Sequence, residues 1–196
     1  MPITFKMIST SRPLGVLRRL KRQDEGSTAI EFAIVSTPFL MFIFALTGIA
    51  LYFFIVSSLE KGLDQSSRPI RTGQAMCAKT TVDQFKQSIC TGAGQWIKCP
   101  KLQIFVKHYA DWSTLNSDTP QPCVDANKNV ITNAVSGSSL IAASAGNASE
   151  VAIVTGCYKW DFPATLPFLK IGNMPDGSLM IQSATAFQAE PYKPCS

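Results

Sequence analysis

The chain has 196 residues, of which 46% are hydrophobic and 16% are charged. This length suits one domain of ordinary size with a short extension, and it excludes an enzyme built from several domains. The formal net charge is +5, but most of it belongs to the first 26 residues. No basic patch with interleaved aromatic residues follows, so we expect no nucleic-acid partner.

The first 26 residues form a basic leader without apolar periodicity. Six basic residues stand there against two acidic ones, which gives the leader a net charge of +4. Positive charge before an apolar span keeps that end of a chain in the cytoplasm and sends the rest outward. We therefore expect a cytoplasmic leader over residues 1–26, disordered or weakly helical over residues 1–13.

A run without any charged residue extends from Phe32 to Leu59, directly after Glu31. Its apolar part, Ala33 to Val56, exceeds the roughly 20 residues that a helix needs to cross a bilayer core. Pro38 lies inside this run, where membrane helices tolerate proline, and it predicts a kink. The sequence therefore predicts a transmembrane helix over residues 27–58.

This helix is expected to begin near Thr28 and to continue beyond the membrane. Leu59, Leu63 and Ile70 would extend an apolar stripe along one of its faces. A break or kink is expected at Arg68, because the residue before a proline disfavours helical dihedral angles.

All cysteines follow the apolar run. An even number on the translocated side is typical of disulfides formed in an oxidising compartment such as a bacterial periplasm. The pairing stays open, although the Gly-rich TGAGQWIK favours a bond between Cys90 and Cys99. A zinc site is the alternative, but the chain has no CxxC pair and a single histidine, His108. The six cysteines are Cys77, Cys90, Cys99, Cys123, Cys157 and Cys195.

A short amphipathic helix is expected from Thr80 to Cys90. Val82, Phe85 and Ile89 recur there at helical spacing, and Thr80 or Thr81 would cap its start.

Three strands are expected from apolar residues in alternation. KLQIFVKHY carries one apolar face, EVAIVTGCYKW carries two, and SLMIQSATAFQAE carries one with small residues between. The four faces hold Leu102, Ile104 and Val106; Val151, Ile153 and Cys157; Val154, Tyr158 and Trp160; and Leu179, Ile181 and Phe187.

The polar segment from Asp111 to Ser149 is long for a structureless loop, so it is either a mobile surface or contains an additional short element. Residues 59–196 as a whole are expected to form a periplasmic α+β domain. In it, a small antiparallel sheet packs on the continuation of the membrane helix.

The carboxylate of Glu31 needs a partner, because an unpaired carboxylate in a bilayer costs about 2.5–3.5 kcal/mol. A basic leader, Gly26, four residues, Glu31 and an apolar helix resemble the type IV prepilin pattern. In that pattern a membrane peptidase cuts after the glycine and leaves glutamate as the fifth residue. A cut between Gly26 and Ser27 would create a charged α-amino group that pairs with Glu31 of the same chain or of a neighbour.

Two other interpretations remain. Thr28 and Glu31 also form a capping-box sequence, in which the Glu31 side chain would bond the N–H of Thr28 without any peptidase. A secretory signal peptide is the second, but its apolar core is normally about 7–15 residues long.

The stretch GSTAIEFAIVSTPFLMFIFALTGIALYF resembles the start of TadE-like proteins, the pseudopilins of the tight-adherence (Flp) pilus machinery. RPIRTGQA, FKQSIC with KCPKLQIFV, and SATAFQAEPY are similar to the periplasmic portion of that family. The resemblance does not extend to residues 111–149 or to cysteines 77, 123, 157 and 195.

The resemblance implies a minor, non-catalytic, pilin-like component that acts in pilus biogenesis, adhesion or biofilm formation. Its partners would be a prepilin peptidase, other pilins, an inner-membrane platform, an assembly ATPase and the lipid bilayer. It would cross the bacterial inner membrane once, with its domain in the periplasm, and need no cofactor or metal.

An enzyme is not supported by the sequence. His108 is isolated, and Asp111, Asp118 and Asp125 lie in a polar loop without a calcium-binding pattern. Trp96, Trp112 and Trp160 are read as core or interface residues. The alternative function is a membrane-anchored periplasmic binding module or hydrolase whose helix serves only as a tether.

Overall fold

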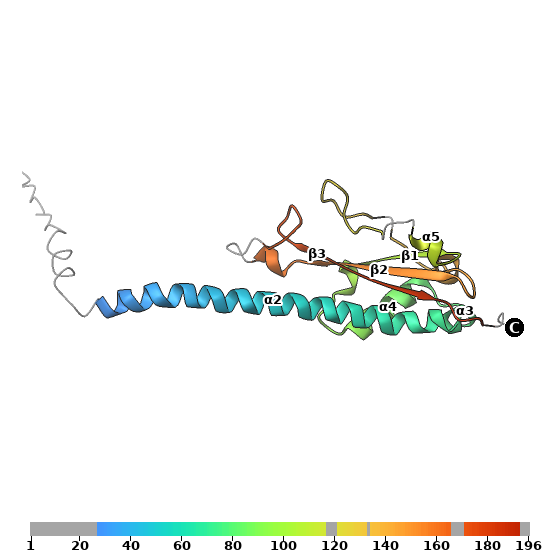
Figure 1. Cartoon of the computed structure of the whole chain (residues 1–196), viewed down its shortest axis with the longest axis horizontal. Coiled ribbons are helices and arrows are strands. Elements are labelled where there is room, and N and C mark those ends of the chain that lie inside the picture. The colour runs from blue at the N-terminus through green and yellow to red at the C-terminus, as the bar shows by residue number, and fades with distance from the viewer. Residues whose placement is uncertain (1–26, 117–120, 133, 166–170, 193–196) are drawn as a thin grey trace, which may run out of the picture. The chain divides into compact units, whose positions relative to one another are not determined.

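The computed structural model describes residues 27–116, 121–132, 134–165 and 171–192 (Figure 1). The chain divides into two units, Met1–Ala50 and Leu51–Ser196. The described part of the first unit is helical throughout, and the second contains the sheet. A long apolar helix followed by a small antiparallel sheet with helices is an α+β organisation, as the sequence predicts.

Helix α2, Ser27–Arg71, is uninterrupted from the first described residue onward. The start expected near Thr28 stays a prediction, because the residues before Ser27 lie outside the described ones. The break expected at Arg68 is wrong. Pro69 lacks an N–H to donate, yet the Arg68 carbonyl still accepts the N–H of Thr72 at 3.1 Å, so the last turn closes. The helix then stops at Gly73, whose φ of 75° suits a residue without a side chain. A kink at Pro38 stays a prediction.

Two further helices follow, α3 (Gln74–Cys77) and α4 (Val82–Ala93). Thr81 is the cap of α4: its hydroxyl accepts from the Gln84 N–H, and the Gln84 side chain accepts from the Thr81 N–H. This reciprocal capping box decides between the two expected caps. The predicted apolar face of the helix is confirmed, since Val82, Phe85 and Ile89 are buried.

The sheet has three antiparallel strands, β1 (Leu102–Tyr109), β2 (Val151–Trp160) and β3 (Leu179–Gln188), in the order β1-β2-β3. All three were expected. The polar segment between β1 and β2 contains the short helices α5 (Trp112–Asn116) and α6 (Ala142–Ala145), which agrees with the second of the two expectations for it. Outside this segment, η2 (Cys99–Lys101) precedes β1 and η3 (Phe162–Thr165) follows β2.

The main core lies between one face of the sheet and the helices α2 and α4. The predicted stripe of Leu59, Leu63 and Ile70 is at most 1% exposed. Helices α2 and α4 approach closely because Gly62 has no side chain: a Cβ there would lie 2.5 Å from the Ile89 carbonyl oxygen. A smaller cluster covers the other face of the sheet and contains Phe105, Cys123, Cys157, Met174 and Met180.

Two disulfides join described residues. Cys90–Cys99 was predicted and is confirmed, with a Cα–Cα distance of 5.7 Å. Cys123–Cys157 links the polar segment to the central strand. Cys77 is disulfide-bonded as well, and Cys195 lies outside the described residues.

Candidate functional site

The predicted processing site lies at the start of α2. Gly26 lies outside the described residues, and Ser27 is the first residue of the helix. Ser27 and Glu31 are four positions apart, so they share one helix face, one turn from each other. The Glu31 side chain is exposed. This geometry is compatible with the predicted pairing of Glu31 with an α-amino group at Ser27.

The capping-box interpretation of Thr28 stays open. A cap residue stands before the first helical residue and has non-helical dihedral angles. Thr28 is helical, as is Ser27, the first residue that the structure describes. What precedes Ser27 lies outside the described residues, so the structure does not place the N-cap of α2.

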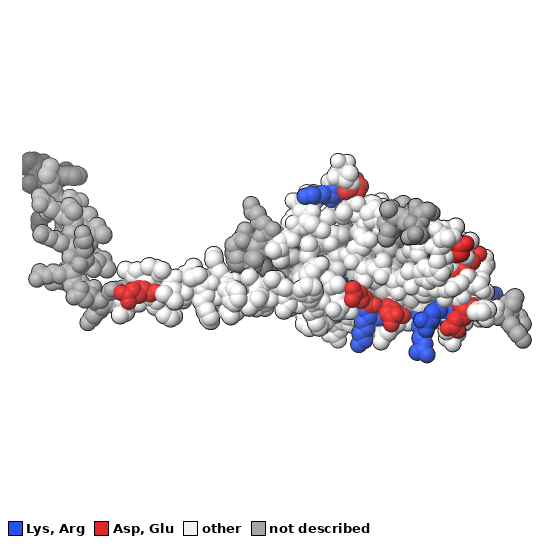
Figure 2. Space-filling view, in the orientation of Figure 1, with Lys and Arg blue, Asp and Glu red and all other residues white. Residues whose placement is uncertain are grey.

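After Glu31, the helix presents large apolar side chains on every side. From Phe32 to Phe54, fifteen large apolar residues are 37–74% exposed. Figure 2 shows, on the face in view, a long uncharged stretch of the helix after one acidic side chain near its start. The helix is long and apolar enough to cross a membrane. Monomeric soluble proteins rarely expose apolar patches beyond a few hundred Å², so this surface needs cover from outside the chain.

The hydroxyl groups of Ser36, Thr37 and Thr47 bond backbone carbonyls within the helix. Thr37 donates to the Ala33 carbonyl at 2.7 Å, and Thr47 donates to the Ile43 carbonyl at 2.9 Å. Bonds of this kind let threonine lie in hydrocarbon without leaving a polar group unpaired. The polar residues of the stretch therefore do not oppose membrane insertion.

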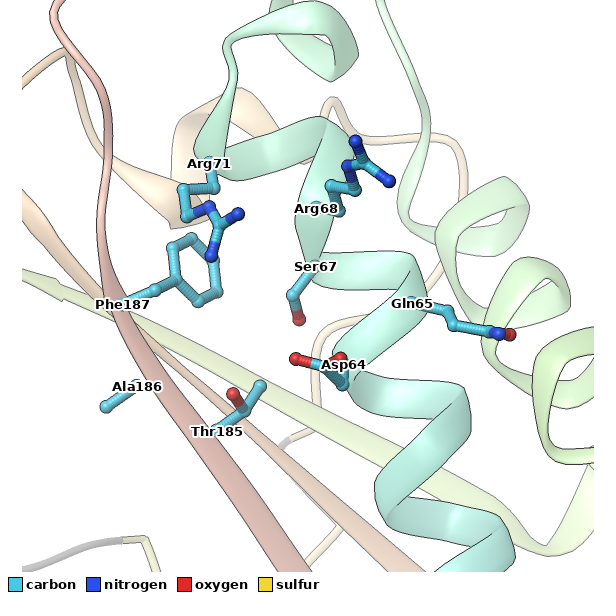
Figure 3. Close-up of a pocket in the computed structure, with 8 residues that line it drawn as sticks. All are labelled: Asp64, Gln65, Ser67, Arg68, Arg71, Thr185, Ala186 and Phe187. Atoms are coloured by element: carbon cyan, nitrogen blue, oxygen red, sulfur yellow. The ribbon is translucent and has the colours of Figure 1, made fainter.

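A groove in the second unit lies between the C-terminal part of α2 and β3 (Figure 3). Asp64, Ser67, Arg68 and Arg71 line it from α2, and Thr185 to Phe187 line it from β3. Arg71 also pairs with Glu190 across 3.7 Å, and both side chains are about half exposed. The lining combines opposite charges, and the Ser67 hydroxyl in it donates to the Leu63 carbonyl at 2.7 Å.

The remaining chemically versatile residues have structural surroundings. His108 bonds the Ser144 carbonyl through Nδ1 at 3.2 Å. The Asp111 carboxylate accepts from the Thr114 N–H at 2.8 Å at the start of α5, which lowers the pKa of Asp111. Asp118 lies outside the described residues. No group of three or more His, Cys, Asp or Glu among the described residues is arranged to hold a metal ion.

Asp125 forms a turn. Its carboxylate accepts from the backbone N–H groups of Asn127 and Asn129 at 2.9 and 2.7 Å. These bonds, that to Asn129 foremost, lower the pKa of Asp125. The carboxylate therefore shapes its own loop.

The three tryptophans have different surroundings. Trp160 is in the core at 9% exposure, whereas Trp96 and Trp112 are 63% and 48% exposed. The ring of Trp96 meets the ring of Phe54 edge to face, 5.5 Å between centroids. Sequence reasoning missed this contact; the available signal was a tryptophan in a Gly-rich loop between two cysteines.

The comparisons with known proteins give one match. Residues 26–68 match a family model described as TadE-like protein. The match agrees with the resemblance found in the sequence. It begins at the predicted cleavage site, spans the apolar stretch and ends within α2, so the sheet and the later stretches lie outside it. No curated protein and no solved structure matches the chain.

Proposed function

Because residues 26–68 match the TadE-like family, we propose that this protein is a minor, pilin-like component of a tight-adherence pilus assembly system. The family links the chain to that machinery, and its role as a non-catalytic pseudopilin in pilus biogenesis and surface adhesion is the proposal. The observation that carries it is the position of the match. The matched range starts at Gly26 and contains both Glu31 and the apolar helix.

The proposed cycle begins in the inner membrane. The bilayer covers the apolar surface of α2, the leader stays in the cytoplasm, and the domain stands in the periplasm. Two observations support this orientation: the leader carries a net charge of +4, and the described cysteines all lie in the second unit and are disulfide-bonded. Disulfides of this kind form in oxidising compartments such as the periplasm.

A prepilin peptidase then cuts between Gly26 and Ser27. The new α-amino group at Ser27 is charged near neutral pH and pairs with the Glu31 carboxylate, in the same chain or in a neighbour. Each charge offsets the burial cost of the other in a low-dielectric medium. This pair is the device that lets the helix move from lipid into a bundle of pilin helices.

During assembly, neighbouring pilins replace lipid around the exposed apolar residues of α2. The inner-membrane platform and the assembly ATPase supply the movement. A folded domain of this size on every subunit would dominate a thin filament, so a priming, tip or regulatory role fits better than that of a bulk subunit.

The test is the intact mass of the protein isolated from its native membrane, with and without the prepilin peptidase. We expect a mature chain that begins at Ser27 in wild-type cells and at Met1 in cells without the peptidase. A chain that begins at Met1 in both would overturn the proposal in favour of a simple membrane tether.

The role of Glu31 is tested separately. Glu31→Ala should insert normally yet reduce piliation strongly, because the amino group at Ser27 loses its counter-charge. Glu60→Ala is the matched control, since Glu60 is an exposed glutamate further along the same helix. Equal piliation in both variants contradicts the proposed charge pairing.

A further inference from the structure

The loop between α4 and β1 is fixed at its base and at its tip. The Cys90–Cys99 disulfide joins the two sides of its base, and the Tyr158 hydroxyl on β2 hydrogen-bonds the backbone of its tip. This hydroxyl donates to the Trp96 carbonyl at 3.3 Å and accepts from the Lys98 N–H at 3.4 Å. The backbone of the loop is therefore fixed against the sheet, while the Trp96 side chain stays 63% exposed.

The Trp96 ring contacts the helix rather than solvent alone. Its neighbour is Phe54, which is itself 46% exposed. Tyr52 and Phe53 also contact each other edge to face, 5.5 Å between centroids. Three consecutive aromatic residues of α2 and one tryptophan of the domain thus gather at one level of the helix.

The length of the apolar stretch indicates where these aromatic residues lie relative to the bilayer. A bilayer core about 30 Å thick takes about 20 helical residues at about 1.5 Å each. Counted from Phe32, the first residue after Glu31, about 20 residues end near Tyr52. The aromatic residues therefore fall where hydrocarbon gives way to headgroups on the far side of the membrane. Tryptophan and tyrosine are enriched at this depth, since their rings combine an apolar body with a polar atom.

The end of the sheet that lies next to the Trp96 loop carries another exposed aromatic residue. Phe162 begins η3, two residues after the end of β2, and stacks on Trp160, 5.6 Å between centroids, with 43% of its surface exposed. The pairing of Leu102 with Tyr158 and of Trp160 with Leu179 places the start of β1, the end of β2 and the start of β3 at this end. The loop of Trp96 precedes β1, so both exposed rings belong to the same edge of the domain.

We propose that this edge of the domain rests on the outer leaflet of the inner membrane, with Trp96 inserted at the level of the phospholipid headgroups. The occupant of the exposed aromatic surface is lipid, because the Trp96 ring contacts Phe54, which belongs to the exposed apolar surface of α2. The disulfide-closed loop then anchors the domain at the membrane interface. The inference rests on the proposed function only in requiring that α2 crosses a bilayer.

The opposite end of the sheet offers a matched control. Trp112 begins α5, just after the end of β1, and is 48% exposed. Since β1 runs from Leu102 to Tyr109, Trp96 and Trp112 stand near opposite ends of the same strand. If the domain is anchored at the interface as proposed, Trp96 lies among the headgroups and Trp112 stays in water.

The experiment uses the full chain in vesicles of phosphatidylcholine and phosphatidylglycerol whose acyl chains carry bromine near the headgroups. Trp112→Phe retains Trp96, and Trp96→Phe retains Trp112, with the buried Trp160 present in both. We expect bromine to quench the Trp112→Phe variant at least about twofold more than the Trp96→Phe variant, as an interfacial ring requires. Both replaced residues are exposed, so both variants should fold.

Flotation of the vesicles separates the possible failures. Equal quenching in the two variants, with the protein floating together with the vesicles, would overturn the insertion of Trp96 and leave the membrane helix intact. A protein that does not float with the vesicles would overturn both the insertion of Trp96 and the membrane anchoring on which the proposed function depends. Failure of peptidase processing, by contrast, does not alter the quenching of Trp96.

Discussion

The two halves of α2 are one continuous helix with opposite surfaces. From Ser27 to Phe54 the large apolar side chains are exposed, and from Ile55 to Arg71 the apolar residues form a single buried stripe. In the second half, charged residues occupy the exposed positions between the stripe residues. They are Glu60, Lys61, Asp64, Arg68 and Arg71.

This difference shows that forming the backbone hydrogen bonds of a helix does not by itself bury its apolar side chains. The backbone hydrogen bonds are the same in both halves, but the second half finds its cover in the sheet and in α4. The first half carries an apolar surface all round, as helices surrounded by lipid or by other helices do. Its function therefore depends on what surrounds the chain.

The strongest test of this contrast replaces residues 30–53 with an unrelated membrane-spanning helix. The replaced segment ends before Ile55, so the core of the domain keeps all its residues. We expect complete loss of pilus assembly and a change of less than about 0.5 kcal/mol in the free energy of unfolding of the domain. Piliation and thermal melting in detergent measure the two effects. Normal piliation would favour the tether.

The reciprocal test shortens one leucine in each half. Leu63→Ala should lower the free energy of unfolding of the domain by about 2–5 kcal/mol, because Leu63 is 1% exposed and its loss leaves a cavity. Leu46→Ala, at a residue that is 49% exposed, should leave domain unfolding unchanged. Chemical denaturation in micelles provides both values. Equal effects would show that the halves do not differ as described.

A pair of glycines refines the comparison further. Gly62→Ala places a Cβ 2.5 Å from the Ile89 carbonyl oxygen and 2.9 Å from the Ala93 Cβ. Overpacking costs about 1–3 kcal/mol, which outweighs the gain in helix propensity of up to about 1 kcal/mol. We expect a net loss of stability in domain melting.

Gly48→Ala is the control for this prediction. A Cβ at Gly48 meets no atom within 4 Å, so the domain should melt as in the wild type. Domain melting of Gly62→Ala at or above the wild-type temperature would contradict the close approach of α2 and α4.

The smallest expected effect is on the stability of the domain at low pH. Lys159 and Ser178 bond the Asp176 carboxylate and hold its pKa well below the usual range. A depressed pKa contributes stability above about pH 4 that is lost as the pH falls through the folded value. Asp176→Asn should therefore flatten the acid side of the stability profile slightly, since the pair is exposed.

Lys159→Met is the matching change for this prediction, because it removes the partner and should flatten the profile in the same way. Thermal melting between pH 2 and pH 7 measures both variants. An unchanged acid limb in both would show that the pair contributes nothing to stability.

Much of the fold was predictable because local patterns and tertiary packing agree. The helical spacing of Leu59, Leu63 and Ile70 identified the buried stripe, and alternation identified all three strands. The Cys90–Cys99 pair followed from the flexible residues between the two cysteines. In each case, the information lies within about a dozen neighbouring residues.

Other features depend on distant contacts. Cys123 and Cys157 are separated by 34 positions, and they meet because the polar segment packs on the second face of the sheet. The proline rule at Arg68 failed because the surrounding helix supplies the remaining hydrogen bonds. The role of Glu31 stays a prediction from the sequence, and its proposed counter-charge would be created by a second protein.

The end of α2 has a consequence for the order in which the domain forms. The Arg71 carbonyl accepts the N–H of Glu190 at 2.8 Å, and Phe187 of the last strand belongs to the same core as Leu59. The second half of α2 is therefore fully covered only once the last strand is in place, so nearly the whole chain must be available before the domain can form. In the orientation proposed above, Leu59 and Leu63 would be uncovered in the periplasm until then, where they would be open to aggregation or to binding by a chaperone.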